Sequence, residues 1–197
     1  MKPRIAQADA ELRQATQDVN YEIYMLFESA SYVGAVWGSP LHTLSNEQAT
    51  MALESFLLHF RNLRAFLCPS LQKAPPRPDD ILGSDFLHKP DPEDVADPNN
   101  IGDDKERLDQ MLAHLTYNRR KVYIASGNIT WNVGKMAVAM LQELEDFLTR
   151  IPHRMKPWFI DHTVIAERKT WIQEWSGPAR AFAHTMGPVR DVRPSKP

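Results

Sequence analysis

The sequence predicts an all-α fold: an antiparallel helical bundle of four to five main helices with a long connector rich in proline and aspartate. Two observations support this prediction. Apolar residues recur three and four positions apart through most of the chain, which is the repeat of one face of a helix. The prolines gather between those stretches and near the C-terminus, where they do not interrupt the repeats. We find no internal repeat and no alternating pattern of the kind that predicts β-strands.

Length and composition indicate one globular domain with a substantial core, since the chain has 197 residues and is 43% hydrophobic. We expect residues 1–175 to form a single bundle, with 69–102 as an irregular connector inside it and 176–197 as a mobile, basic, proline-rich tail. No run of 18 apolar residues is present, so we expect no membrane span. A single cysteine cannot form an internal disulfide, which favours a reducing compartment and a cytoplasmic protein.

The first predicted helix covers residues 5–33. Its apolar face keeps spacings of three and four over about eight turns, through Ile5, Ala8, Leu12, Ala15, Val19, Ile23, Leu26, Ala30 and Val33. Three tyrosines, Tyr21, Tyr24 and Tyr32, widen this face in the second half of the helix. We expect the helix to end before Gly34, ahead of the breaking sequence at residues 38–40.

A second helix is predicted over residues 46–68, because Ser45 and Gln48 have the spacing of a capping box. Its buried stripe consists of Leu53, Phe56, Leu57, Phe60, Leu63 and Leu67. His59 interrupts this stripe, and we interpret it as a histidine at the edge of the core with a hydrogen-bond partner. Without an HxxxH or HxH spacing, a metal site there is the weaker interpretation. We interpret Cys68 as packed and unreactive.

Residues 69–102 change character, because seven prolines exclude helices and central strands from most of this stretch. Residues 81–87 form an apolar island within it. We therefore expect an ordered connector that is pinned at Phe86 and Leu87, with mobility over residues 90–100.

Two further main helices are predicted over residues 104–119 and 130–151. The former has Leu108, Met111, Leu112 and Leu115 on one face, and Gly127-Asn128 separates it from the latter. One or two short helices are expected between residues 155 and 175. Trp171 and Trp175 lie four residues apart there and form an aromatic ridge that belongs either to the core or to a partner surface.

The charge is distributed unevenly along the chain. Residues 1–73 carry 6 basic and 7 acidic groups, residues 74–106 carry 3 and 10, and residues 107–197 carry 14 and 8. A basic C-terminal half suits an anionic partner, although solvated helix faces also produce such patterns. No phosphate-binding loop, dinucleotide fingerprint, nucleophile elbow or zinc cluster is present, so most other enzyme classes are excluded. We expect no cofactor and no metal.

The candidate catalytic residues are Arg107 and His114. They are seven positions apart, so on a helix they share a face and lie about 10.5 Å apart along the axis. Arginine presents a permanently charged fork that fits phosphate oxygens, and histidine transfers protons near neutral pH. Together they can cleave RNA with the ribose 2′-hydroxyl as the nucleophile. In the alternative interpretation, Arg107 pairs with Asp103 or Asp104 and His114 satisfies a buried group.

Residues 107–114, with Arg first and His last, fit the Arg-X(4–6)-His signature of the HEPN superfamily. The sequences at 53–59 and 113–117 also resemble uncharacterised bacterial proteins of HEPN-like organisation. The resemblance spans roughly residues 45–150. It implies a small helical bundle, and it implies a metal-independent ribonuclease or an RNA-binding component of a toxin–antitoxin or defence system. We expect a homodimer in which two Arg107/His114 faces meet.

Arg119, Arg120 and Lys121 stand between two tyrosines and are the candidate nucleic-acid-binding residues. Their cations suit phosphates, and the neighbouring rings suit stacked bases. The alternative is that these basic residues stabilise the C-terminus of a helix. A second function of a different class is a non-catalytic helical module that binds a protein partner, such as an antitoxin-like protein.

Overall fold

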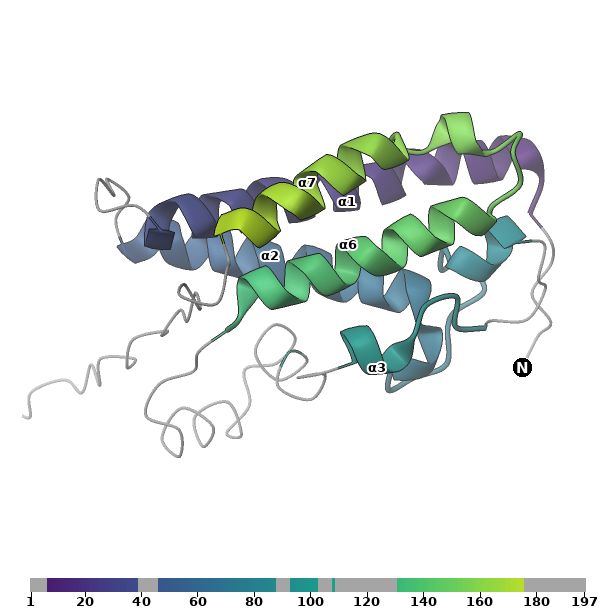
Figure 1. Cartoon of the computed structure of the whole chain (residues 1–197). Coiled ribbons are helices and arrows are strands. Elements are labelled where there is room, and N and C mark those ends of the chain that lie inside the picture. The colour runs from purple at the N-terminus through teal and green to yellow at the C-terminus, as the bar shows by residue number, and fades with distance from the viewer. Residues whose placement is uncertain (1–6, 39–45, 88–92, 103–107, 109–130, 176–197) are drawn as a thin grey trace, which may run out of the picture.

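The computed structural model describes residues 7–38, 46–87, 93–102, 108 and 131–175. The described part is mostly helical and contains no strand, which confirms the all-α prediction. Four long helices build the bundle: α1 (Asp9–Gly38), α2 (Asn46–Leu67), α6 (Val133–Arg150) and α7 (His162–Trp175). Figure 1 shows that α1 and α2 run antiparallel to each other, as do α6 and α7.

The helix α6 lies at the centre of the packing, because it contacts α1, α2, α7 and the short helix α3 (Pro98–Ile101). Asn132 caps its N-terminus by accepting a hydrogen bond from the backbone N–H of Lys135 at 3.0 Å. Half of its residues are buried, namely Val133, Gly134, Ala137, Met140, Leu141, Glu143, Leu144, Phe147 and Leu148. A helix with this much buried surface derives its stability from packing more than from its intrinsic propensity.

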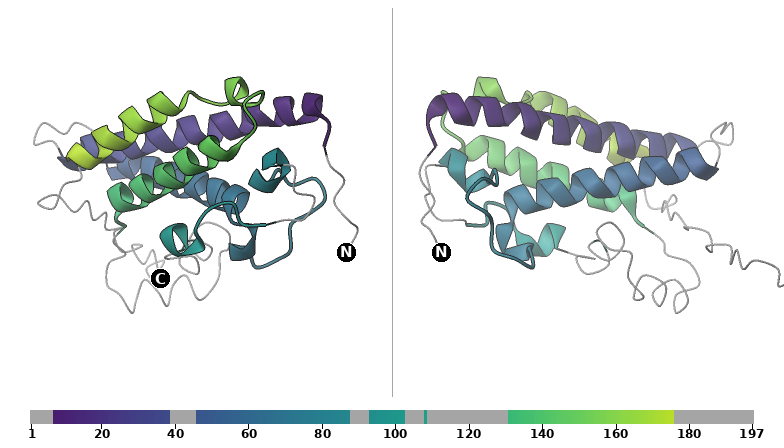
Figure 2. Two further views of the ribbon diagram at one scale, coloured as in Figure 1. Left: turned by 45° about the vertical axis from the view of Figure 1, so that its right-hand side comes forward. Right: turned by 180° about the vertical axis from the view of Figure 1, so that it is seen from behind.

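The path of the chain from α2 to α6 is set by where these helices end and begin. Figures 1 and 2 show that α2 ends at one end of the bundle and α6 begins near the other, so residues 68–132 have to return along its length. Along this return lie the 3₁₀ helices η1 (Pro69–Leu71) and η2 (Gly83–Leu87), followed by α3. A third 3₁₀ helix, η3 (Lys156–Trp158), joins α6 to α7.

Four phenylalanines from α2, η2, α6 and the segment before α7 pack edge to face. The ring centroids lie 5.4 Å apart for Phe66 and Phe147 and 5.1 Å apart for Phe86 and Phe159. Phe147 also contacts Phe86 and Phe159. Phe86 is completely buried, so the predicted anchor at this position is confirmed. The cluster fixes η2 against the bundle.

Two predictions about the first helix need correction, namely its limits and the burial of its tyrosines. The first helix begins at Asp9 and continues to Gly38, not ending before Gly34, because a single glycine is tolerated inside a helix. Tyr21, Tyr24 and Tyr32 do not widen its buried face, since more than half of each side chain is exposed. The predicted helices at 46–68 and 130–151 match α2 and α6 closely, and η3 and α7 are the short helices expected after residue 155.

Mobility over residues 90–100 stays a prediction, but the described residues 93–102 make specific contacts with the bundle. Val95 and Ile101 are buried, and the Val95 N–H donates to the carbonyl of Leu67 at 2.7 Å. A Cβ on Gly83 would lie 2.5 Å from the Cγ2 methyl of Val95, so any other residue at this position would force one of the two segments to shift. The predicted helix 104–119, apart from Leu108, and the predicted tail at 176–197 lie outside the described residues.

Replacing Phe147 with alanine is expected to lower the free energy of unfolding by about 3–5 kcal/mol. The Phe147 ring packs against three other rings, and its removal leaves a cavity among them. Urea denaturation followed by circular dichroism measures this loss. Val164→Ala on the exposed side of α7 serves as the control and should change stability by no more than about 0.5 kcal/mol. A loss below about 1 kcal/mol for Phe147→Ala would contradict the central place of the cluster.

Candidate functional site

The residues that the sequence predicts to act on RNA lie outside the described part of the chain. These are Arg107 and His114 as the catalytic pair and Arg119, Arg120 and Lys121 as the nucleic-acid-binding residues. The described residues on either side of them do show where the chain enters and leaves this segment.

Glu143 of α6 holds the chain just before residues 103–130, which contain the predicted site residues. Its side chain is buried, and it accepts hydrogen bonds from the backbone N–H of Asp97 at 2.9 Å and from the side-chain amide of Asn100 at 2.5 Å. Asp97 in turn caps α3 by accepting from the N–H of Asn99 at 2.9 Å. Two donors on a buried carboxylate offset the cost of removing its charge from water. This arrangement fixes α3, which ends two residues before Asp103.

Two buried apolar residues mark the segment itself and its end. Leu108 belongs to the hydrophobic core and has no exposed surface, in agreement with the predicted apolar stripe at this position. Trp131 is also fully buried and directly precedes the cap of α6. Arg107 is thus joined by one peptide bond to a residue of the core.

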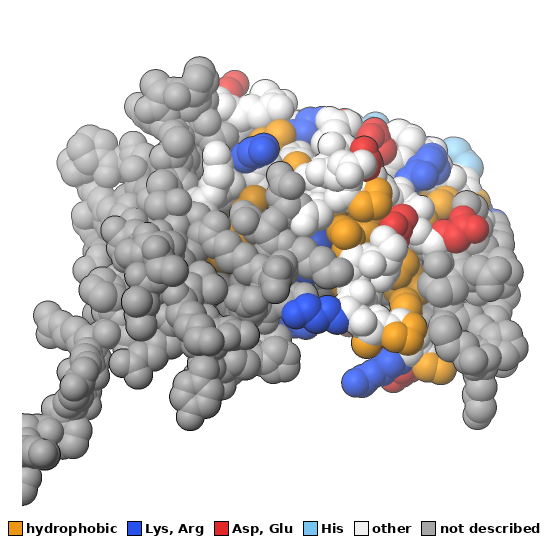
Figure 3. Space-filling model, turned by 90° about the horizontal axis from the view of Figure 1, so that it is seen from below, with side chains coloured by type: hydrophobic (Ala, Val, Ile, Leu, Met, Phe, Trp, Pro, Cys, Tyr) orange, Lys and Arg blue, Asp and Glu red, His pale blue; other side chains and the backbone are white. Residues whose placement is uncertain are grey.

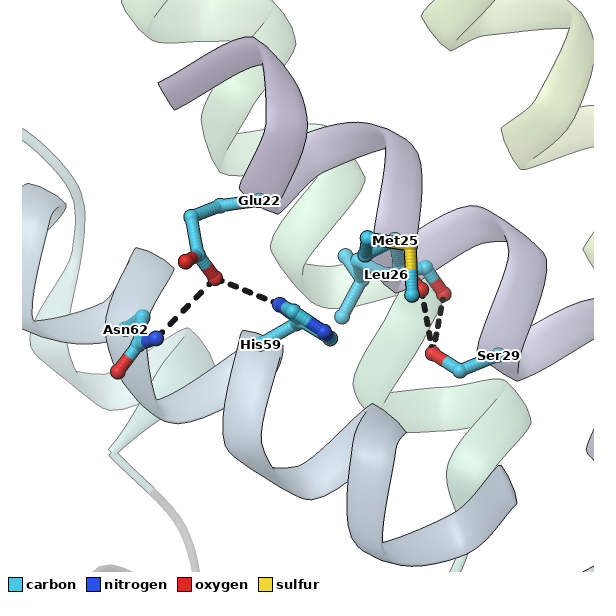
Figure 4. A network of polar contacts seen from close by, with 6 residues as sticks. All are labelled: Glu22, Met25, Leu26, Ser29, His59 and Asn62. Carbon is cyan, nitrogen blue, oxygen red and sulfur yellow. Dashed lines mark hydrogen bonds and ion pairs between the residues drawn. The ribbon is translucent and has the colours of Figure 1, made fainter. Parts of the chain in front are cut away.

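His59 of α2 lies at the seam between α1 and α2 (Figure 4). Its Nδ1 atom lies 2.7 Å from the Glu22 carboxylate, which also accepts from the Asn62 side chain at 3.2 Å. The Tyr21 ring meets the imidazole edge to face, with centroids 5.7 Å apart. Only 7% of the His59 side chain is exposed. The prediction of a hydrogen-bonded histidine at the edge of the core is confirmed, and the arrangement joins two helices.

Cys68 follows α2 and is fully buried. Burial and, to a smaller extent, the nearby Asp94 carboxylate together raise the pKa of its thiol from 9.0 to about 12. The thiol donates to the carbonyl of Ala96 at 3.3 Å. A thiol that stays protonated at neutral pH is a poor nucleophile, so the structure supports the prediction of an unreactive cysteine.

A small pocket of about 380 Å³ lies beside η1. Its wall consists of prolines, alanine, two acidic residues and a few polar residues, namely Pro69, Ser70, Gln72, Lys73, Ala74, Pro75, Pro76, Glu93 and Asp94. Asp94 accepts from both the backbone N–H and the hydroxyl of Ser70, which occupies its carboxylate. Asp94 is thus held in place by Ser70 on the wall of the pocket.

The described surface shows no single-sign patch in the view of Figure 3, where Lys and Arg side chains alternate with acidic and apolar ones. Within the described ranges, no three His, Cys, Asp or Glu side chains are grouped so that they could hold a metal ion. Every helix in those ranges is too short or too polar to span a lipid bilayer.

No protein-family model, curated protein or solved structure matches this chain.

Native Cys68 is expected to react with iodoacetamide at pH 8 at least about 100-fold more slowly than the same cysteine in the denatured chain. With a pKa of about 12, only roughly 10⁻⁴ of the thiol is ionised at this pH. Mass spectrometry of timed samples measures the modification, and free cysteine controls for the reagent. Equal rates in the native and denatured protein would show that the thiol is accessible.

Proposed function

We propose that the chain is a HEPN-like helical protein that binds RNA and cleaves it without a metal ion. The observation that best supports this proposal is the burial of Leu108 in the core of an all-α bundle. Leu108 is the second residue of the Arg-X6-His sequence, so one position of the candidate motif belongs to the folded domain. Glu143 and Trp131 secure the chain on both sides of the segment.

In the proposed reaction, His114 takes the proton from the ribose 2′-hydroxyl and returns a proton to the leaving oxygen. Arg107 stabilises the additional negative charge on the phosphate in the transition state. Arg119, Arg120 and Lys121 bind the phosphates of the substrate and guide it. Two copies of the chain bring their Arg107/His114 faces together across a cleft.

The second candidate is a non-catalytic module that binds a protein partner. One observation favours it: large apolar side chains of the described helices remain in contact with solvent, including Trp171 on α7, which is 41% exposed. Exposed aromatic residues are enriched at protein interfaces.

His114→Ala is expected to reduce RNA cleavage by roughly 10²–10⁴, because a positioned general acid/base is lost. Arg107→Lys should fail as well, since an ammonium group cannot form the bidentate contact of a guanidinium with phosphate. Single-turnover cleavage of labelled RNA, with and without excess chelator, measures these effects. Cleavage by the wild-type protein should survive the chelator.

Circular dichroism and melting of both variants provide the control, and they should match the wild type. If wild-type protein leaves RNA intact while His114→Ala lowers the stability by about 1–3 kcal/mol, His114 has a structural role. The catalytic proposal would then be wrong, and the interaction module would remain.

A further inference from the structure

The outer face of α1 and α2 carries five large apolar side chains that are open to solvent, and we call it the tyrosine face. Its residues and their exposed fractions are Tyr21 56%, Tyr24 53%, Tyr32 56%, Met51 68% and Leu58 43%. In the right-hand view of Figure 2, α1 and α2 lie in front of α6 and α7, with no other described element over them. Five such residues on two neighbouring helices exceed what isolated exposed side chains explain.

Helix geometry places these residues on one side of the helix pair. Tyr21 and Tyr32 are eleven positions apart, which is close to three full turns. Met51 and Leu58 are seven apart, close to two turns, and Leu58 shares its face with Asn62 one turn later. Tyr21 contacts His59, and Asn62 contacts Glu22, so the two rows meet along the same seam.

This helix pair carries a strong negative charge. The residues of α1 and α2 include 7 Asp or Glu and 3 Lys or Arg, a net charge of −4. Of the three basic residues, Arg64 is buried. Three carboxylates, Asp18, Glu28 and Glu54, are at least partly exposed on these helices. An apolar strip with acidic residues beside it is complementary to a positively charged, amphipathic partner.

We propose that the tyrosine face binds a basic amphipathic helix of another protein chain. The apolar side of such a helix would cover the tyrosine, methionine and leucine side chains. Its Lys and Arg residues would pair with the carboxylates and lie over the tyrosine rings, whose faces attract cations. From Tyr21 to Tyr32 the face is about 16 Å long, which matches about three turns of a partner helix.

The charge also argues against two other occupants. A second copy of this chain would bring the carboxylates beside the tyrosine face against an identical set, on a helix pair of net charge −4, which opposes association. RNA carries a negative phosphate backbone and is repelled for the same reason. The proposal goes beyond the RNA-directed function, and it does not depend on Arg107 or His114.

The test uses the full-length protein and a fluorescein-labelled synthetic helix of about 18 residues made of leucine and lysine. Fluorescence anisotropy should show saturable binding that weakens as the salt concentration rises. Met51→Ser combined with Leu58→Ser should weaken binding at least tenfold, an effect typical of interface anchors. Glu28→Lys combined with Glu54→Lys should weaken binding similarly, and Tyr24→Ser should add to either effect.

Three controls separate this face from the rest of the molecule. Val164→Ser removes an exposed apolar residue of α7 and should leave binding unchanged. A matched peptide with glutamate in place of lysine should not bind. All changed residues have exposed or partly exposed side chains, so melting temperatures should stay near that of the wild type.

Binding that persists unchanged in the Met51/Leu58 and Glu28/Glu54 variants would overturn the proposal, as would equal binding of the glutamate peptide. Loss of binding with Val164→Ser alone would place the peptide on α7 and overturn it too. A dimer in sedimentation that the Met51/Leu58 variant dissociates would assign the face to a second copy. Because His114→Ala should leave peptide binding intact, failure of RNA cleavage and failure of this proposal are distinguishable.

Discussion

The buried carboxylate of Glu143 is the interaction on which the course of the chain between α2 and α6 depends. It accepts hydrogen bonds from Asp97 and Asn100, and Arg150, two turns further along α6, donates to the Val95 carbonyl. One helix thus holds the returning chain at two points. Since α6 also contacts α1, α2 and α7, the same element organises both the bundle and the connector. The acidic, proline-rich stretch at 93–102 is therefore part of the fold.

The helices were predictable from the sequence because their apolar residues follow a helical period, and α2 and α6 end within a few residues of the predicted limits. The anchoring of residues 93–102 was not predictable, because these residues are held by two charged side chains and by the backbone. Neither kind of group leaves a periodic signal. The exposure of Tyr21, Tyr24 and Tyr32 was missed for a related reason: amphipathic aromatic residues count as apolar in a pattern whichever side they face.

The candidate sites differ in how much of each could be predicted from the sequence. The role of His59 was predictable, since a polar residue inside an apolar stripe needs a partner. The identity of that partner, Glu22, was not, because it stands 37 positions away in the chain. The motif at 107–114 rests on spacing alone and is joined to the described structure only through Leu108. The tyrosine face depends on two helices being side by side, which only the structure reveals.

Native-state amide hydrogen exchange of the full-length protein tests most directly whether α6 fixes the connector. The N–H groups of Val95 and Asp97 are both bonded to the bundle, so they should exchange at least about 100-fold more slowly than in a free peptide. Glu143→Ala should remove the protection of Asp97, whereas Glu145→Ala on the same helix should preserve it. Exchange of Val95 and Asp97 at the free-peptide rate in the wild-type protein would contradict this account.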